Sequence, residues 1–498
     1  MTPKVVLFYP PYDGPPLSAP LCLLSLAGAL LESGIEARVI DAAVTPDWPA
    51  VLARELKDAV GLGISVLTGP MIRGALRAAR IARACRPELP VIFGGWHPSL
   101  VPEQTLRNPL VDVIVRGQGE RTLLELVQQL VSGGGAHGIR GTSWREGDRY
   151  AQAFDRPVEN LNHLPTPAYH LADYDEYARV SGARKLSYAT SVGCPYACHY
   201  CTDQVFYKRR FNAYSAERVG REVPELVERY RIEEVALLDS NFPVDVHRAV
   251  AIARSFVASG VRFRWTFQAS TDFLCRMTED DVRVMAQSGL THMGFGTESA
   301  SPDVLALMNK KHQRIDEMYE TARKAELAGI HVTYNLIFGY PGETEADRIE
   351  TLRIMGDIAR RHWNVSFSPN IFTPYPGIPI WPQLRELGVH EPQSMEEWAD
   401  LPLGQNVLPW LQGEDLKRLR VMLQFFLLNN QIRKATKSTP ALRRGFRRML
   451  GAPVRWRLRK SFFRVPWELA VARVAEKVIM RRSLITGVPL REDMNEAC

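Results

Sequence analysis

The segment Gly193-Cys194-Pro195-Tyr196-Ala197-Cys198-His199-Tyr200-Cys201 directly follows a strand-like stretch, Leu186 to Val192. Its three cysteines have the spacing C-x3-C-x2-C, whereas the other four cysteines of the chain are scattered singly. Three thiolates on one tight loop can ligate three irons of a [4Fe-4S] cluster and leave the fourth iron open to a substrate or cofactor. The segment therefore predicts a metal site with Cys194, Cys198 and Cys201 as ligands.

Two other uses of the three cysteines are less favoured. Structural zinc usually takes four ligands, and His199, the candidate for the fourth, stands between two of the cysteines and would strain the loop. Unligated, buried thiols would have to gather in eight residues by chance while the other four cysteines are spread over the chain.

The cysteine segment belongs to a β/α series that runs from Lys185 to about Pro379. Six apolar runs read as strands, alternating with helical stretches: 186–192, 234–238, 263–269, 292–296, 331–338 and 366–372. Six strands predict a partial barrel that is open on one side, with its site at the carboxyl ends of the strands.

A second β/α series precedes it, from residue 4 to about 130. Its strands are expected at 5–9, 37–40, 60–66, 91–93 and 111–115, with helices at 21–31, 50–59, 71–85 and 121–131. This alternation predicts a doubly wound parallel sheet whose ligands bind outside the carboxyl ends of the strands. No G-x-G-x-x-G follows the first strand, which argues against an ordinary dinucleotide site.

C-x3-C-x2-C with an aromatic residue, Tyr200, before the third cysteine resembles the radical S-adenosylmethionine (SAM) superfamily. The resemblance implies that Cys194, Cys198 and Cys201 bind a [4Fe-4S] cluster, that SAM chelates the open iron, and that reduction releases a 5′-deoxyadenosyl radical. It also implies SAM contacts from Asp239 and Asn241 in Leu237–Phe242 and from Glu298 in Gly296-Thr297-Glu298-Ser299. Glu343, in a Pro-Gly-Glu turn, is favoured as structural.

The unit before the barrel resembles the cobalamin-binding domain of the B12-dependent radical SAM subfamily. The motifs that carry this resemblance stand at expected strand ends: Tyr9-Pro10-Pro11, Ser65 to Gly69, Gly94-Gly95-Trp96-His97-Pro98 and Gly117-Gln118-Gly119-Glu120. The resemblance implies cobalamin contacts from Ser65, Thr68, Gly94, Gly95, His97, Gly117, Gly119 and Glu120. No D-x-H-x-x-G supplies a histidine to cobalt, so the lower ligand stays unassigned; for His97 a hydrogen-bonding role is favoured over ligation.

These observations predict an α/β protein in four parts. They are a doubly wound, Rossmann-like cobalamin-binding domain (1–135), a linker rich in Gly and Pro (136–184), a partial (β/α)6 radical SAM barrel (185–380), and a helical, basic C-terminal region (381–498).

The C-terminal region concentrates the positive charge. Between Arg433 and Arg482 the sequence has sixteen Lys or Arg and two Glu, while the whole chain has a net charge of +7. Arg455 to Arg464 interleaves basic residues with Trp and Phe. A solvated basic face, peripheral contact with anionic lipid and nucleic-acid binding all fit this pattern, with nucleic acid the least favoured.

The remaining sequence features bear on the cellular compartment in which the protein is found. The seven cysteines are too sparse for a disulfide framework in 498 residues. The apolar run Ala19 to Leu31 is too short to span a bilayer, and the N-terminus lacks the pattern of a signal peptide. A cytoplasmic location is expected, with membrane association through the basic region left open.

The two resemblances together imply a cobalamin-dependent radical SAM enzyme. One SAM would methylate cob(I)alamin and a second would yield the radical that activates an unactivated carbon for methylation. The substrate would be a small molecule or lipid-like, and flavodoxin or ferredoxin would supply the electron. A cyclase, ring-contraction or oxidation enzyme with the same cofactors is the alternative, and a non-catalytic SAM- or corrin-binding regulator is an alternative of another class. A methylthiotransferase is less favoured because no second cysteine set is present.

Overall fold

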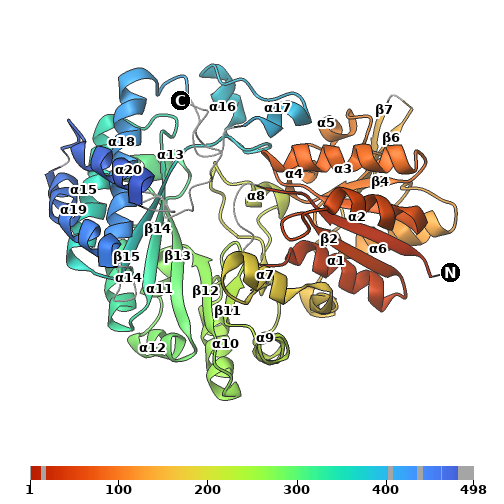
Figure 1. Ribbon diagram of the computed structural model, residues 1–498, viewed down its shortest axis with the longest axis horizontal. Coiled ribbons are helices and arrows are strands. Elements are labelled where there is room, and N and C mark those ends of the chain that lie inside the picture. Colours follow the sequence, from red (N-terminus) through yellow and green to blue (C-terminus); the bar gives the residue numbers. More distant parts are fainter. Residues whose placement is uncertain are drawn as a thin grey trace.

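The computed structural model describes residues 2–12, 18–147, 149–401, 408–433, 441–460 and 462–479. Two sheets side by side form the framework, the first largely parallel and the second entirely parallel (Figure 1). Parts of the expected basic region, residues 434–440 and 480–498, lie outside the described residues.

The first sheet has the strand order β2-β1-β3-β4-β5-β6-β7. Its parallel strands are β1 (Lys4–Tyr9), β2 (Glu36–Asp41), β3 (Ala59–Ser65), β4 (Val91–Gly94) and β5 (Val113–Val115). The helices are α1 (Leu21–Glu32), α2 (Trp48–Glu55), α3 (Met71–Cys85), α4 (Trp96–Leu100), α5 (Pro102–Leu106) and α6 (Glu120–Val131), and Leu56–Asp58 form a 3-10 turn. The expected doubly wound fold is confirmed.

Side-chain alternation along β1 explains why both faces of this sheet are covered. Val5 and Leu7 pack in one core with residues of α1 and α6, whereas Val6 and Phe8 pack in the other with residues of α2 and α3. All four side chains are fully buried. Near-continuous apolar strands of this kind form where helices lie on both faces of a parallel sheet.

The segment expected to be a linker contains regular structure. β6 (Thr142–Glu146) and β7 (Arg149–Gln152) extend the first sheet with antiparallel pairing. Two 3-10 turns (Leu161–His163 and Tyr169–Leu171) and α7 (Tyr174–Ser181) then lead to the second sheet.

The second sheet is parallel and open, with the order β15-β14-β13-β12-β11-β8. Its strands are β8 (Lys185–Tyr188), β11 (Glu234–Leu237), β12 (Arg264–Ala269), β13 (Leu290–Glu298), β14 (His331–Phe338) and β15 (Val365–Ile371). The helices are α8 (Asp203–Phe206), α9 (Ala216–Tyr230), α10 (Val246–Ser259), α11 (Asp272–Cys275), α12 (Glu279–Gln287), α13 (Pro302–Leu307), α14 (Ile315–Leu327) and α15 (Glu345–Arg361). The partial barrel of six strands is confirmed (Figure 1).

One expected strand, residues 186–192, is broken. The ladder of β8 ends at Tyr188, and β9 (Ser191–Val192) pairs antiparallel with β10 (Asn212–Ala213) instead. The break has a local cause, because Asp239 accepts hydrogen bonds from the backbone N and hydroxyl of Thr190 and from the Ser191 hydroxyl. A side chain that bonds the backbone competes with the sheet ladder.

The C-terminal helices are α16 (Trp381–Glu386), α17 (Met395–Ala399), α18 (Gly413–Arg433), α19 (Ala441–Lys460) and α20 (Trp467–Ile479). α17 lies against the first domain, where Asn108 Nδ2 donates to Glu396 at 3.0 Å. α18 covers β15: Asn430 Oδ1 accepts from the backbone N of Phe367 at 3.0 Å, and its amide nitrogen donates to the carbonyl of Phe367. The amide thereby pairs the backbone of Phe367 at the open edge of the sheet.

Candidate functional site

The cysteine segment forms a loop at the carboxyl end of the barrel. Cys198 is buried, and Cys194 and Cys201 are half-buried. The loop is fastened to the residues after α13: the backbone N of His199 donates to Met308 O at 2.9 Å, and Asn309 Nδ2 donates to Ala197 O at 2.7 Å. The three thiols are thus held on one anchored turn between β9 and α8.

Burial raises the pKa of all three thiols, that of Cys201 to about 12. The unligated cysteines are therefore neutral near pH 7, and iron binding has to displace their protons. Within the part of the chain that the structure describes, no group of three or more His, Cys, Asp and Glu side chains is arranged to hold a single metal ion.

Gly193 fixes the entry into the cysteine loop. Its φ is +76°, and a Cβ there would lie 1.9 Å from the carbonyl oxygen of Arg210. Gly182 has a similar φ of +84° but nothing within 4 Å of the added Cβ. Alanine at either position would therefore pay for the left-handed backbone, but only alanine at position 193 would also clash with a neighbouring atom.

We expect Gly193→Ala to prevent cluster assembly and Gly182→Ala to permit it. Both substitutions place alanine in the left-handed region at a cost of about 1–2 kcal/mol. Only the first also forces the Arg210 carbonyl to move. Iron and sulfide content after anaerobic reconstitution measures the difference, and equal loading of the two variants would contradict the role assigned to Gly193.

Asp239, expected to contact SAM, lies fully inside the protein. Its two carboxylate oxygens accept the bonds from Thr190 and Ser191 described above, and Arg248, which lies near it, donates to the Thr190 carbonyl at 2.8 Å. Burial raises the pKa of Asp239, and the hydrogen bonds that it accepts oppose this shift. In this structure the carboxylate braces the start of the cysteine loop.

Asn241 lies beside the cysteines. Its Nδ2 is 4.0 Å from Cys194 Sγ, and its Oδ1 accepts from the backbone N of Ser270 at 3.4 Å. The structure thus brings Asn241, but not the carboxylate of Asp239, to the edge of the predicted metal site.

Glu298 ends β13 in a left-handed conformation, with φ +61°. Tyr200 OH donates to Glu298 Oε1 at 2.9 Å, and Lys310 Nζ lies 3.5 Å from the same oxygen and 3.2 Å from Tyr200 OH. Although burial works against its charge, the Glu298 carboxylate and the thiols of Cys198 and Cys201 raise the pKa of Lys310. Sequence reasoning missed Lys310 because it stands in an ordinary polar loop.

Glu343 caps the turn after β14. Its Oε2 accepts from the backbone N of Gly339 at 2.5 Å and lies 3.3 Å from Arg348 Nη1. Burial raises the pKa of Glu343 to about 7. These contacts match the structural role favoured from the sequence.

Tyr196 of the cysteine loop forms part of an aromatic wall. Its ring stacks on His312, with the ring centroids 3.7 Å apart and an interplanar angle of 4°. Burial lowers the pKa of His312 to about 4, so the imidazole is neutral near pH 7. Tyr196 OH also donates to Asp272 Oδ2 at 3.3 Å.

Several buried polar atoms around this end of the barrel have no hydrogen-bond partner among the described residues. They include Thr297 Oγ1, His312 Nε2, Gln313 Oε1, Tyr340 OH and Glu343 Oε1. Leaving a buried donor or acceptor unpaired costs about 1–3 kcal/mol. Together with the three thiols, these atoms fit a polar ligand such as SAM beside an iron–sulfur cluster.

The residues expected to contact cobalamin follow the carboxyl ends of β3, β4 and β5, as the doubly wound fold requires. Gly95 has a φ of +89°, and a Cβ there would be 3.0 Å from Ser65 Oγ and from the backbone of Val66. Gly119 leads into α6, where Ser25 Oγ donates to Glu120 Oε1 at 2.9 Å. Gly94 ends β4, and Gly117, with φ +70°, has open space at its Cβ.

His97 is fully buried rather than open to a ligand. Its Nδ1 lies 3.1 Å from Thr68 Oγ1, and its ring meets Trp398 of α17 at a centroid distance of 6.2 Å. Burial lowers the pKa of His97 to about 3. The Thr68 contact fits the hydrogen-bonding role favoured from the sequence, although Nε2 is unpartnered among the described atoms.

The two predicted sites lie against each other. Trp96, next to Gly95, packs on Phe206 of α8 at 4.3 Å and on Tyr207 at 5.9 Å between ring centroids. α8 begins two residues after Cys201. The carboxyl edge of the first sheet therefore abuts the cysteine loop of the barrel (Figure 1).

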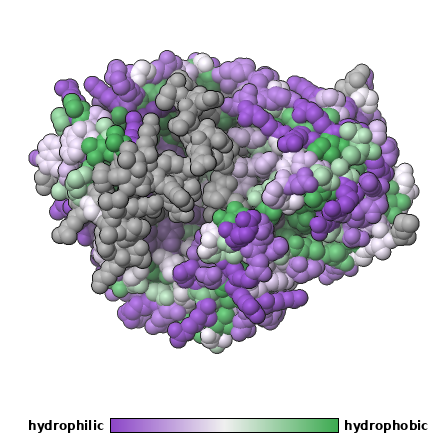
Figure 2. Space-filling model, viewed as in Figure 1, coloured by the Kyte–Doolittle hydropathy of each residue, from purple (hydrophilic) through white to green (hydrophobic). Residues whose placement is uncertain are grey.

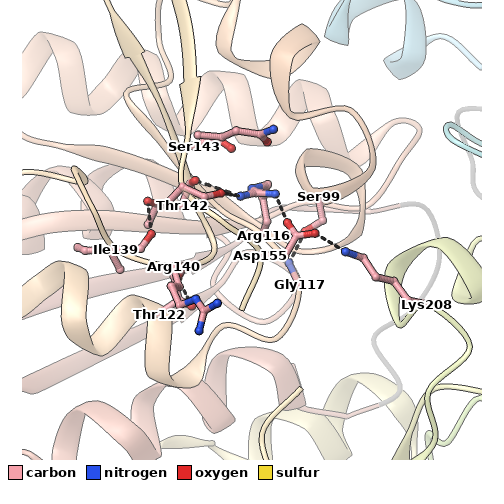
Figure 3. Close-up of polar contacts among 12 residues, drawn as sticks. Ser99, Arg116, Gly117, Thr122, Ile139, Arg140, Thr142, Ser143, Asp155 and Lys208 are labelled. Carbon is pink, nitrogen blue, oxygen red and sulfur yellow. Dashed lines mark hydrogen bonds and ion pairs between the residues drawn. The ribbon is translucent and has the colours of Figure 1, made fainter. Parts of the chain in front are cut away.

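An ion-pair chain also joins the two domains. Asp155, after β7, pairs with Arg116 at the end of β5 and with Lys208, just beyond α8 (Figure 3). Arg116 also donates to Ala153 O at 2.5 Å, and the neighbouring Gly117 N donates to Ser99 Oγ at 3.0 Å. Lys208 and the nearby positive charge of Arg116 lower the pKa of Asp155. The chain connects the Gly117 loop to the segment that follows the cysteines.

Two family models match the chain: the B12 binding domain over residues 3–127 and the radical SAM superfamily over residues 188–355. The uncharacterized methyltransferase PH0819 of Pyrococcus horikoshii is 30% identical over 396 residues, which cover 76% of this chain and 82% of that protein. The anaerobic magnesium-protoporphyrin IX monomethyl ester cyclase of Rubrivivax gelatinosus is 24% identical over 377 residues, which cover 73% of this chain and 66% of that protein.

A solved structure shows the same fold over almost the whole chain. The radical SAM methyltransferase TsrM of Kitasatospora setae, with cobalamin and a [4Fe-4S] cluster bound, superposes with a TM-score of 0.71 at 18% identity. The match covers 95% of this chain and 100% of that one. The resemblances drawn from the cysteine motif and from the first domain are therefore confirmed, and the chain belongs to the cobalamin-dependent radical SAM enzymes, whose cofactors are a [4Fe-4S] cluster, SAM and cobalamin.

Proposed function

We propose that this enzyme methylates an unactivated carbon of a small, hydrophobic or lipid-like substrate. The observation that carries the proposal is the contact between the two sites, in which Trp96 beside the Gly94–Gly95 turn packs on Phe206 beside the cysteine loop. A substrate held at this junction would be within reach of both. The methyltransferase relative, at 30% identity, supports methyl transfer over other outcomes.

When bound, the reduced cluster and SAM supply a 5′-deoxyadenosyl radical, and cobalamin supplies the methyl group. Cys194, Cys198 and Cys201 would hold the cluster. Asn241 and Glu298 would orient SAM, and Asp239 would brace the loop that carries the cysteines. Ser65, Thr68, Gly94, Gly95, Gly117, Gly119 and Glu120 would form the cobalamin edge, and His97 would position Thr68 through their hydrogen bond.

The electron needed for each radical would come from an external donor such as flavodoxin or ferredoxin. No helix within the described part of the chain is both long and apolar enough to cross a lipid bilayer.

The test is anaerobic reconstitution with iron, sulfide and cobalamin, followed by reduction with SAM and chromatographic quantification of two products. Methyl transfer is expected to give both S-adenosylhomocysteine and 5′-deoxyadenosine. Cysteine variants should lose 5′-deoxyadenosine, because the cluster cleaves SAM, and cobalamin-edge variants should lose S-adenosylhomocysteine, because cobalamin accepts the methyl group. If the wild-type protein formed neither product, the proposal would be contradicted, and a non-catalytic SAM- or corrin-binding regulator would be favoured instead.

A second candidate is a cobalamin-dependent cyclase or related enzyme that transfers no methyl group. Its support is the relative named as a magnesium-protoporphyrin ester cyclase, at 24% identity. This candidate predicts 5′-deoxyadenosine without S-adenosylhomocysteine. The same chromatogram thus separates the two candidates.

A further inference from the structure

The end of α19, the loop that follows it and the start of α20 display apolar side chains to solvent. Trp456 and Trp467 are each 46% exposed, Phe462 is 43% exposed and Val465 is 78% exposed. Lys460 and Arg464 are exposed among them. We call the six residues Trp456, Lys460, Phe462, Arg464, Val465 and Trp467 the tip. Figure 2 shows hydrophobic atoms beside hydrophilic ones at the end of the molecule where α19 and α20 lie.

One buried arginine contacts the tip from inside the protein. Arg457, 4% exposed, donates to Glu468 Oε1 at 2.5 Å, to Arg464 O at 2.7 Å and to Val465 O at 2.8 Å. It also lies over the Phe462 ring, 5.7 Å from the centroid. Arg457 therefore differs from the exposed basic residues around it, because its buried guanidinium organises the loop.

Val465 is held in an unfavourable conformation. Its φ of +49° lies in the left-handed region, which β-branched residues rarely adopt. The arginine contacts to the carbonyls of Arg464 and Val465 fix this turn, and it leaves the aliphatic side chain pointing outward. Exposing Val465, Trp467 and Phe462 together to water does not stabilise the folded chain. This cluster of exposed apolar side chains therefore indicates a contact surface.

The positive charge around the tip indicates which kind of partner it binds. Residues 441–474 contain ten Lys or Arg and a single acidic residue, Glu468, which is buried against Arg457. Exposed Arg455 and Arg473 add to the charge of the tip itself. Tryptophan favours the boundary between lipid headgroups and acyl chains, and basic residues near it are attracted to anionic headgroups. An aliphatic side chain such as Val465 gains nothing from nucleic-acid bases, which favour stacking on aromatic rings.

We propose that the tip docks on the surface of an anionic lipid bilayer, with Val465, Trp467 and Phe462 entering the headgroup region and Lys460 and Arg464 contacting lipid phosphates. This inference rests on the exposed side chains and their charge. It also gives the proposed lipid-like substrate a route to the enzyme, but it stands if the substrate proves to be soluble.

The test uses the double variant Val465→Asn/Trp467→Ser in the reconstituted full-length enzyme. Asparagine tolerates the left-handed region better than valine, so the substitution at position 465 should not destabilise the turn, and urea unfolding of the double variant checks that it is folded. The matched control is Leu327→Asn/Trp363→Ser, which replaces exposed apolar residues on the barrel, 66% and 63% exposed, outside the basic segment. Flotation with phosphatidylcholine vesicles, with and without phosphatidylglycerol, measures binding.

The wild type and the control should float with phosphatidylglycerol vesicles, and the double variant should bind about tenfold less lipid. Raising NaCl from 0.1 to 0.5 M should weaken wild-type binding by a similar factor because it screens the charges. Equal flotation of the double variant and wild type, or no flotation of either, would overturn the inference. So would displacement of the protein from vesicles by an oligonucleotide at stoichiometric concentration, since that outcome assigns the tip to nucleic acid.

Discussion

Cys198→Ala is expected to abolish SAM cleavage, leaving 5′-deoxyadenosine at the background of the protein-free reaction. The cysteine loop offers three thiols on one anchored turn, and a cluster held by all three keeps a single iron open for SAM. With two thiolates the cluster loses a protein ligand, so both its retention and its single open position are lost. Product quantification, iron and sulfide content and the electron paramagnetic resonance signal of the reduced protein check the result.

Cys275→Ala is the matched control for this prediction. Cys275 is also a free, half-buried cysteine of the barrel, but its thiol lies 3.9 Å from the carbonyl oxygen of Glu317, in contact with α14 rather than with the cysteine loop. The control should retain its cluster and its SAM cleavage. A Cys198→Ala protein that still cleaves SAM would remove the basis for the cluster site.

The family and the two β/α units could be predicted because their signals are local. Three cysteines in eight residues define a loop without knowledge of the fold, and alternating apolar runs define β/α units. β6 and β7 escaped prediction because short, partly exposed strands in a segment rich in Gly and Pro lack a continuous apolar pattern. The break after Tyr188 was missed because its cause, Asp239, comes about fifty residues later.

The contacts of several polar side chains also could not be predicted, because their partners are distant in the sequence. Asp239 and Asn241 are two residues apart, yet one carboxylate turns inward to Thr190 while the neighbouring amide reaches Cys194. Likewise, Asp155 joins Arg116 to Lys208 across two domains, although each residue alone reads as a solvated charge. Such pairings depend on tertiary contacts, and a single sequence contains no periodic signal for them.

Lys310→Met is expected to destabilise the barrel by about 3 kcal/mol and to lower the reduction potential of the reconstituted cluster. Lys310 and Glu298 are both buried, with side chains 6% and 9% exposed, and Tyr200 OH contacts both. Removing one partner of a buried ion pair leaves the other charge uncompensated, which typically costs 3–5 kcal/mol. The ammonium also lies close enough to Cys198 and Cys201 for these side chains, when ionised, to raise its pKa. A positive charge at this place favours the reduced, more negative cluster, so its removal should make reduction harder.

Lys311→Met separates these effects from a general loss of charge. Lys311 is the next residue along the chain and is exposed, so its substitution should change neither stability nor potential. Urea unfolding of the unreconstituted proteins measures the first effect, and a redox titration of the reconstituted proteins measures the second. If Lys310 had only a structural role, Lys310→Met would lower the urea midpoint of unfolding and leave the reduction potential of the cluster unchanged. A Lys310→Met protein as stable as Lys311→Met would contradict the buried ion pair itself, and with it the position of Glu298 beside the cysteine loop.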